Sequence, residues 1–109
     1  MYKAPTENDV QRVLDLVVKE VDPLRVVLFG SLARGDEDPG DIDLLVVMPD
    51  GTNRLEILQQ LDSMLCAHPD LRADVDFVVA TPEVLVRFSN SVLSVYPLAL
   101  CEGRELYAA

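Results

Sequence analysis

Apolar side chains recur at steps of three and four residues near the start of the chain. The positions are Val10, Val13, Leu14, Val17, Val18 and Val21, with charged residues between them. This spacing brings them to one face and predicts an amphipathic α-helix. Thr6 is a residue type that caps helix N-termini, and a residue that precedes proline is disfavoured in a helix. We therefore expect the helix to begin after Thr6 and to end near Asp22, before Pro23.

Three short apolar runs further along the chain predict β-strands. Two of them, residues 25–29 and 42–48, are followed by glycine or proline, which favour turns, and the third covers residues 74–79. Near the end of the chain, residues 105–107 predict a short strand at the edge of the sheet.

Helical spacing returns between the second and third of these strands. Leucines at positions 55, 58, 61 and 65 predict a helix over residues 53–67, with Asn53 as its N-cap. Thr81, Pro82 and Glu83 fit the N-cap and first turn of a further helix, which we expect to extend to about Asn90. Residues 91–102 are expected to add one or two helical turns.

The lengths of the connections predict the topology. The segment between residues 29 and 41 is too short to carry a parallel crossover, so the first two strands are expected to be antiparallel. The next connection contains a whole helix, which indicates that the second and third strands are parallel and joined by a right-handed crossover. We therefore expect an α/β (α+β) fold, a small mixed β-sheet flanked by helices, as a single domain over residues 1–109.

The charge of the chain narrows the range of partners. Nineteen acidic residues face nine basic ones, and the net charge of −10 opposes the phosphate neutralisation on which nucleic-acid binding depends. The longest apolar runs are about five residues, far below the roughly 20 that span a bilayer, and the first residues do not have the pattern of a secretory signal. We expect a cytoplasmic protein that binds neither nucleic acid nor membrane.

The two cysteines, Cys66 and Cys101, lie among apolar residues and are expected to be reduced, packed thiols. The chain has a single histidine and no pair of cysteines at metal-binding spacing, which argues against a zinc site.

Aspartates begin two of the predicted strands, and the predicted topology brings them together. Antiparallel pairing places Gly30 beside Asp41, and parallel pairing brings the start of the third strand to the same edge. Asp41 and Asp43 are two residues apart and share a face, and either Asp74 or Asp76 joins them. Carboxylates this close repel one another, and a divalent cation such as Mg²⁺, held together with substrate phosphates, relieves that repulsion.

These residues also resemble a known signature. The run Gly-Ser-Leu-Ala-Arg-Gly at 30–35, followed by Asp-Ile-Asp-Leu-Leu-Val at 41–46, resembles the DNA polymerase β-like nucleotidyltransferase superfamily, and specifically its minimal nucleotidyltransferase branch. The resemblance extends to residues 75–83 and 102–107 and so covers nearly the whole chain.

The resemblance implies a nucleotidyltransferase fold and a role for each residue of the motif. Gly30 and Ser31 would hold the triphosphate of ATP, and Asp41 and Asp43 would ligate two Mg²⁺ ions. The third carboxylate would complete one metal site and help to deprotonate the attacking hydroxyl. We favour Asp76 for this role, because the sequence that follows it repeats the pattern after Asp43.

The role of Arg34 stays open between contact with phosphate or base and an ion pair with the acidic turn at 36–38. The resemblance further implies transfer of AMP to a tyrosine of a HEPN-domain ribonuclease toxin, which would make the chain the antitoxin of a toxin–antitoxin pair that assembles with its toxin. Two alternatives remain: adenylylation of a small molecule such as an aminoglycoside, and neutralisation of a toxin by binding alone.

Overall fold

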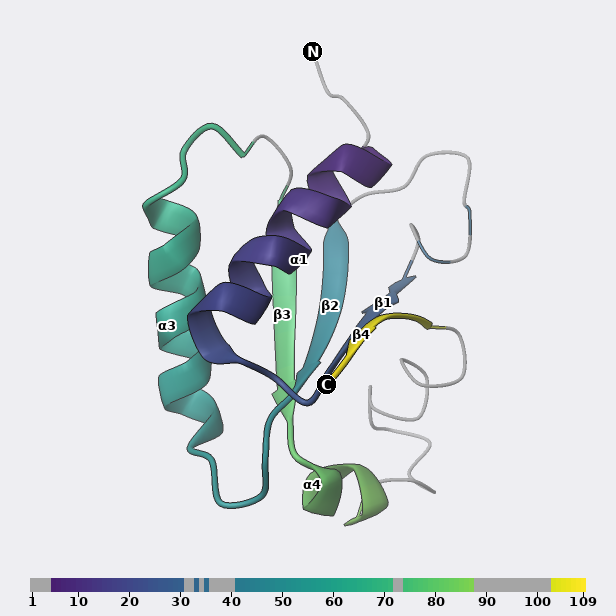
Figure 1. Cartoon of the computed structure of the whole chain (residues 1–109), viewed down its shortest axis with the longest axis vertical. Helices are drawn as coiled ribbons and strands as arrows, with labels where there is room; N and C mark the ends of the chain where they lie inside the picture. Colours follow the sequence, from purple (N-terminus) through teal and green to yellow (C-terminus); the bar gives the residue numbers. More distant parts are fainter. Residues whose placement is uncertain (1–4, 31–32, 34, 36–40, 72–73, 88–102) are drawn as a thin grey trace.

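The computed structural model describes residues 5–30, 33, 35, 41–71, 74–87 and 103–109. Its elements follow the order predicted from the apolar pattern (Figure 1). They are α1 (Glu7–Val21), β1 (Arg25–Phe29), β2 (Ile42–Val47), α3 (Arg54–Cys66), β3 (Val75–Ala80), α4 (Pro82–Arg87) and β4 (Arg104–Ala108). The helical turns expected over residues 91–102 lie outside the described residues.

The first helix has the ends that its sequence predicts. The Thr6 hydroxyl accepts a hydrogen bond from Asp9 N at 3.2 Å, while Thr6 N donates to Asp9 Oδ2 at 2.9 Å, so two backbone N–H groups near the N-terminus of α1 are satisfied. At the other end Asp22 adopts a left-handed conformation with φ 49°, and Pro23 follows. Helix α1 therefore ends abruptly at Val21, and the chain turns and enters β1 at Arg25.

The four strands form one mixed sheet in the order β3-β2-β1-β4. β1 pairs antiparallel with β2 and with β4, whereas β2 pairs parallel with β3. Both predicted pairings are confirmed, and β4 lies at the edge as expected. The strand ends differ from the prediction by one residue, because β2 ends at Val47 and β3 runs from Val75 to Ala80.

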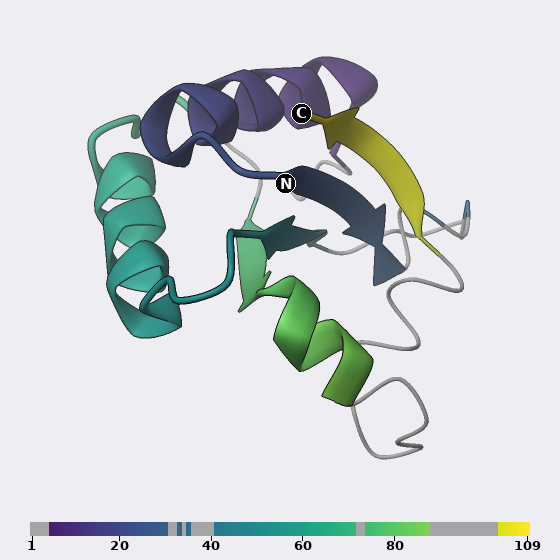
Figure 2. The same cartoon turned by 60° about the horizontal axis from the view of Figure 1, so that its bottom comes forward.

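Helices lie on both faces of the sheet (Figure 2). The main core lies between the sheet and α1 and α3, where Val13, Val17, Leu44 and Leu61 are fully buried. A smaller cluster on the opposite face joins alternate residues of β1 and β2 to Val84 of α4. Helix α4 therefore covers the end of the sheet at which β3 finishes, and it lies far from the opposite end (Figure 1).

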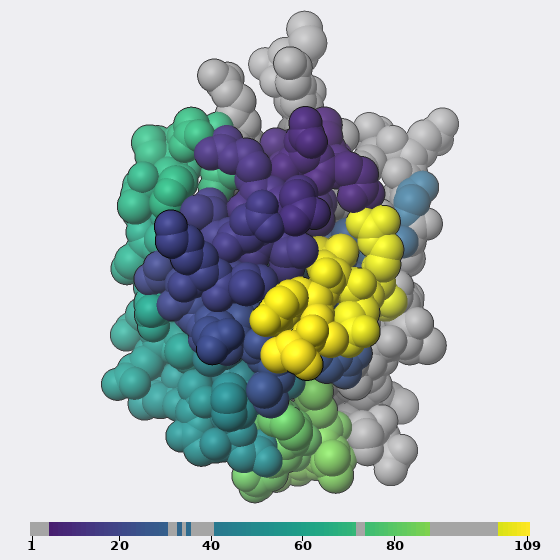
Figure 3. Space-filling model, viewed as in Figure 1, coloured from purple at the N-terminus to yellow at the C-terminus, as the bar shows by residue number. Residues whose placement is uncertain are grey.

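The edge strand β4 lies beside α1 on the face shown in Figure 3. Arg104 on β4 bonds to Glu7 on α1 at 3.0 Å, and Glu105 bonds to Arg25 on β1 at 2.6 Å. These exposed pairs join the last strand to the first two elements of the chain.

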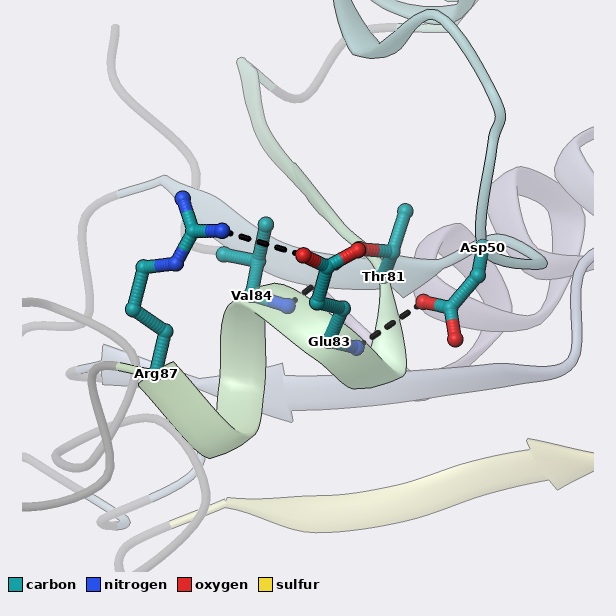
Figure 4. A network of polar contacts seen from close by, with 5 residues as sticks. All are labelled: Asp50, Thr81, Glu83, Val84 and Arg87. Atoms are coloured by element: carbon teal, nitrogen blue, oxygen red, sulfur yellow. Dashed lines mark hydrogen bonds and ion pairs between the residues drawn. The ribbon is translucent and has the colours of Figure 1, made fainter.

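The start of α4 is fastened to the loop after β2 (Figure 4). The Thr81 hydroxyl accepts from Val84 N at 3.3 Å, as its predicted role of N-cap requires. Asp50 Oδ1 accepts from Glu83 N at 2.9 Å, a contact that links two segments 33 residues apart. Glu83 also pairs with Arg87 along the helix at 3.0 Å.

Cys66 differs from expectation. It is a free thiol, as predicted, but it is exposed at the last residue of α3 and is not packed, because it lies on the same helix face as the exposed Asp62 and Ser63. Cys101 lies outside the described residues. Among the helices in the described ranges, none combines the length and apolarity needed to cross a membrane.

Candidate active site

The candidate site lies where β1 ends and where β2 and β3 begin, at the upper end of the sheet in Figure 1. Phe29 pairs with Asp43, and Asp43 pairs with Asp76 across the parallel strands. Since alternate residues of a strand share a face, Asp43 lies on the face of Leu45, and Asp76 lies on the face of Val78. Both carboxylates therefore belong to the face opposite α1, at the end that α4 leaves uncovered.

Gly30 touches this site through its backbone. Its φ of 78° is in the left-handed region, and a side chain added at this position would overlap the carboxylate of Asp43. Only glycine can bring the end of β1 so close to Asp43. The sequence predicted Asp41 as the neighbour of Gly30, whereas the structure places the Asp43 side chain against Gly30, because the antiparallel register pairs Phe29 with Asp43.

Asp41 precedes β2 in a bend and meets Asp76 on the neighbouring strand. A hydrogen bond between the two carboxyl groups, followed by partial desolvation and by the negative charge of Asp76, raises the pKa of Asp41 from its usual value of 3.8. A protonated Asp41 donates to the Asp76 carboxylate and so removes part of the repulsion between them. A divalent cation can relieve the same repulsion without the proton.

An open hollow of about 440 Å³ adjoins this pair on the side of β3 and α3. Three aspartates and four less polar residues line it: Asp41, Asp74, Asp76, Leu65, Cys66, Leu71 and Val75. Asp74 lies just before β3, is exposed, and fixes the start of the parallel pair by accepting from Ile42 N at 2.8 Å through its carbonyl. Sequence reasoning placed the aspartates here but missed the two leucines: the helical spacing of Leu65 indicated only a core position, and Leu71 lies after the predicted helix.

The hard oxygen donors at this rim suit Mg²⁺. The sequence predicted Asp41, Asp43 and Asp76 as its ligands, and the structure brings these three residues to one end of adjacent strands. Within the described part of the chain, however, no three His, Cys, Asp or Glu side chains already surround a single point as a metal-binding group. Ser31, Arg34 and the acidic turn at 36–38 lie outside the described residues.

A comparison with known protein families found a match. Residues 10–104 match the model of the nucleotidyltransferase domain family. No curated protein matches the chain.

The chain is also similar to three solved structures. A protein of Sulfolobus solfataricus that is described as a candidate nucleotidyltransferase is 26% identical, with a TM-score of 0.49, over 79% of this chain and 85% of that one. Two mutants of the toxin–antitoxin MntA–HpeT contain chains that are 23% and 22% identical, with TM-scores of 0.53 and 0.50. They cover 97% and 96% of this chain and 75% of their own.

Proposed function

Since the chain belongs to the nucleotidyltransferase domain family, we propose that it transfers AMP from ATP to a tyrosine hydroxyl of a HEPN ribonuclease toxin. This activity would make it the antitoxin of a toxin–antitoxin pair. The observation that carries the proposal is the meeting of Gly30, Asp43 and Asp76 at one end of three adjacent strands. Similarity in fold to chains of MntA–HpeT supports the choice of a toxin as partner.

The proposed roles follow the position of each residue along the rim. Gly30 lets the backbone approach the triphosphate, and Ser31 would add an N–H and a hydroxyl donor. Asp41, Asp43 and Asp76 would hold two Mg²⁺ ions. The ions would supply positive charge to the phosphates and to the attacking and leaving oxygens.

In the proposed reaction, the tyrosine oxygen forms a bond to the α-phosphorus of ATP. The bond from that phosphorus to the bridging oxygen breaks, and pyrophosphate leaves with its electron pair. Asp76 would accept the proton of the hydroxyl, because it stands at the end of the rim next to the open hollow. Ser31 would position the triphosphate without taking part in proton transfer.

The proposal is tested by replacing the acids without changing their size. Asp43→Asn and Asp76→Asn should each lower AMP transfer on the order of 100-fold or more, because the phosphates and the attacking group lose their positioning and charge. Asp62→Asn, at an exposed position on α3 away from the rim, is the matched control. Intact mass spectrometry of the cognate toxin, incubated with ATP and Mg²⁺, measures the addition of AMP.

The folded state of each variant is checked by circular dichroism. Transfer by Asp76→Asn at the wild-type rate would refute the assigned site. A toxin that is neutralised without any gain in mass, equally by wild type and by Asp76→Asn, would show that the chain acts by binding alone. Modification of an aminoglycoside, with the toxin left unmodified, would instead identify a small-molecule acceptor.

A further inference from the structure

The outer strand β3 pairs on one side only among the described residues. It stands at the end of the order β3-β2-β1-β4 and has β2 as its partner. The carbonyls of Asp74 and Ala80 each accept a hydrogen bond of 2.8 Å from the chain at either end of β2. Because the direction of these groups alternates along a strand, the odd-numbered residues direct their N–H and C=O groups to the free edge. They are Val75, Phe77 and Val79.

Helix α3 runs beside this edge and borders it with apolar side chains (Figure 1). Leu55 and Leu58 line a hollow of about 420 Å³ together with Val79, near the end of β3. Leu65 lines the hollow of about 440 Å³ together with Val75, near the start of the strand. The helix and the strand therefore run in opposite directions. Leu55 is 63% exposed, so part of this apolar border lacks cover among the described residues.

The two ends of the edge carry opposite charges. Asp74 and Asp76 are exposed at the start of β3, whereas the exposed Arg54 lines the hollow at the other end, beside Val79. A strand that binds antiparallel to β3 matches this pattern if its own start is acidic and if a basic residue accompanies its end. The edge of a second copy has both features, so the edge is complementary to itself.

We propose that the free edge of β3 binds the same edge of a second copy of this chain. A twofold axis through Phe77 pairs Val75 with Val79 of the second copy and joins the two sheets into one. Arg54 of each copy then lies beside Asp74 of the other, and the apolar sides of the two α3 helices face each other. This association goes beyond the proposed function and does not depend on AMP transfer.

Like charges oppose the association but do not outweigh the complementary pairs. The net charge of −10 on each copy is screened beyond about 8 Å at physiological salt, so the charges near the contact dominate. Among these, the exposed Asp62 lies on α3 between the two hollows and meets its counterpart across the axis. That repulsive contact occurs once, whereas the contact between Arg54 and Asp74 occurs twice by symmetry. We therefore expect a weak, reversible dimer.

Sedimentation velocity of the full chain at roughly 1 to 500 μM measures this association. We expect wild type to form dimers as its concentration rises. Arg54→Glu should weaken the dimer about tenfold or more, because two attractive contacts become repulsive. Adding Asp74→Arg to this variant reverses both partners and should restore the dimer. Lys19→Glu, at an exposed position on α1, changes the total charge by the same amount and should stay near wild type.

A further variant has the opposite expected sign. Asp62→Asn should strengthen the dimer about two- to fivefold, because it removes the like-charge contact at the axis. Circular dichroism checks that each variant is folded, and if Arg54→Glu does not fold, Asp62→Asn alone decides.

Three outcomes would overturn the proposal. The first is a wild type that stays monomeric throughout this range, whether the edge then binds a strand of another protein or none. The second is an equal effect of Arg54→Glu and Lys19→Glu, or a double variant that does not recover. The third is a dimer that Asp62→Asn does not strengthen, which would place the contact elsewhere on the surface.

Discussion

Gly30 joins backbone conformation to the chemistry of the rim. Three glycines of the described chain have positive φ, at positions 30, 35 and 51, but only the first lies against a proposed metal ligand, Asp43. At Gly35 and Gly51 an added Cβ meets nothing within 4 Å. Gly30 is therefore required for two reasons, its left-handed backbone and the lack of space for a side chain. Only the first reason applies at Gly35 and Gly51.

Gly30→Ala should lower both stability and AMP transfer. The left-handed conformation alone costs a non-glycine residue about 1–2 kcal/mol, and the clash with Asp43 adds to this. Gly51 has φ 88°, and an added Cβ there meets nothing within 4 Å. Gly51→Ala is therefore the control that loses stability through the backbone conformation alone. Urea denaturation should show a larger loss for Gly30→Ala, and only this variant should lose transfer. Equal losses of stability would mean that Asp43 moves aside without cost.

The start of α4 shows how an element can depend on a distant residue. Asp50 lies in the loop after β2 and accepts from Glu83 N (Figure 4). Asp50→Ala should lower the free energy of unfolding by about 1 kcal/mol, the usual value of a lost helix cap. Asp50→Asn keeps an acceptor oxygen in the same place and should lose less. Chemical denaturation measures both, and equal stability of Asp50→Ala and wild type would contradict the assignment.

The ion pair between Arg12 on α1 and Asp70 holds the segment after α3, which leads to Leu71 and the hollow. The two side chains are 2.5 Å apart, and the contact with Arg12 lowers the pKa of Asp70 from its usual 3.8. A carboxyl whose pKa is lower in the folded state stabilises that state above pH 3.8 and loses this contribution as the pH falls through the lowered value.

Asp70→Asn should therefore be less stable than wild type at neutral pH, and the difference should close as the pH falls below 3.8. Both partners are about half exposed, so added salt should also reduce the difference. Thermal unfolding from pH 7 to pH 2 measures the effect. Asp62→Asn is the control, and a difference that stays constant through this range would exclude the ion pair as its cause.

Local sequence patterns predict the helices and strands of this chain well, but they predict the contacts between these elements poorly. The spacing of Val10, Val13 and Val17, the cap at Thr6 and the apolar runs sufficed for α1, β1 and β2, because each signal is contained within one element. The exact register of β1 against β2 does not follow from such runs. The prediction therefore placed Gly30 beside Asp41, whereas the side chain that Gly30 meets is that of Asp43.

Contacts across long separations carry no local signal at all. The bond from Glu83 N to Asp50 and the apolar wall of the hollow both depend on how elements distant in the sequence pack together. The meeting of the aspartates was predictable, because the connection lengths determine whether strands are parallel and hence which ends meet.

At the scale of the whole molecule, excess negative charge and the acidic rim predict different responses to cations. A net charge of −10 disfavours the compact state through self-repulsion, and any salt reduces this effect by screening. A cation bound at the rim would add stabilisation that depends on its own affinity. By linkage this is about 2.7 kcal/mol at about 100 times the dissociation constant.

MgCl₂ should therefore raise the melting temperature of wild type more than NaCl does at the same ionic strength. Asp76→Asn should lose this excess while keeping the response to NaCl, because it removes a proposed ligand but changes the total charge by only one unit. Asp62→Asn, with the same change in charge, should keep the excess. Thermal melts followed by circular dichroism measure the three proteins without ATP or toxin. If Mg²⁺ and Na⁺ stabilise wild type equally at matched ionic strength, the aspartates of the rim act only as surface charge, and the metal-dependent part of the proposed mechanism is wrong.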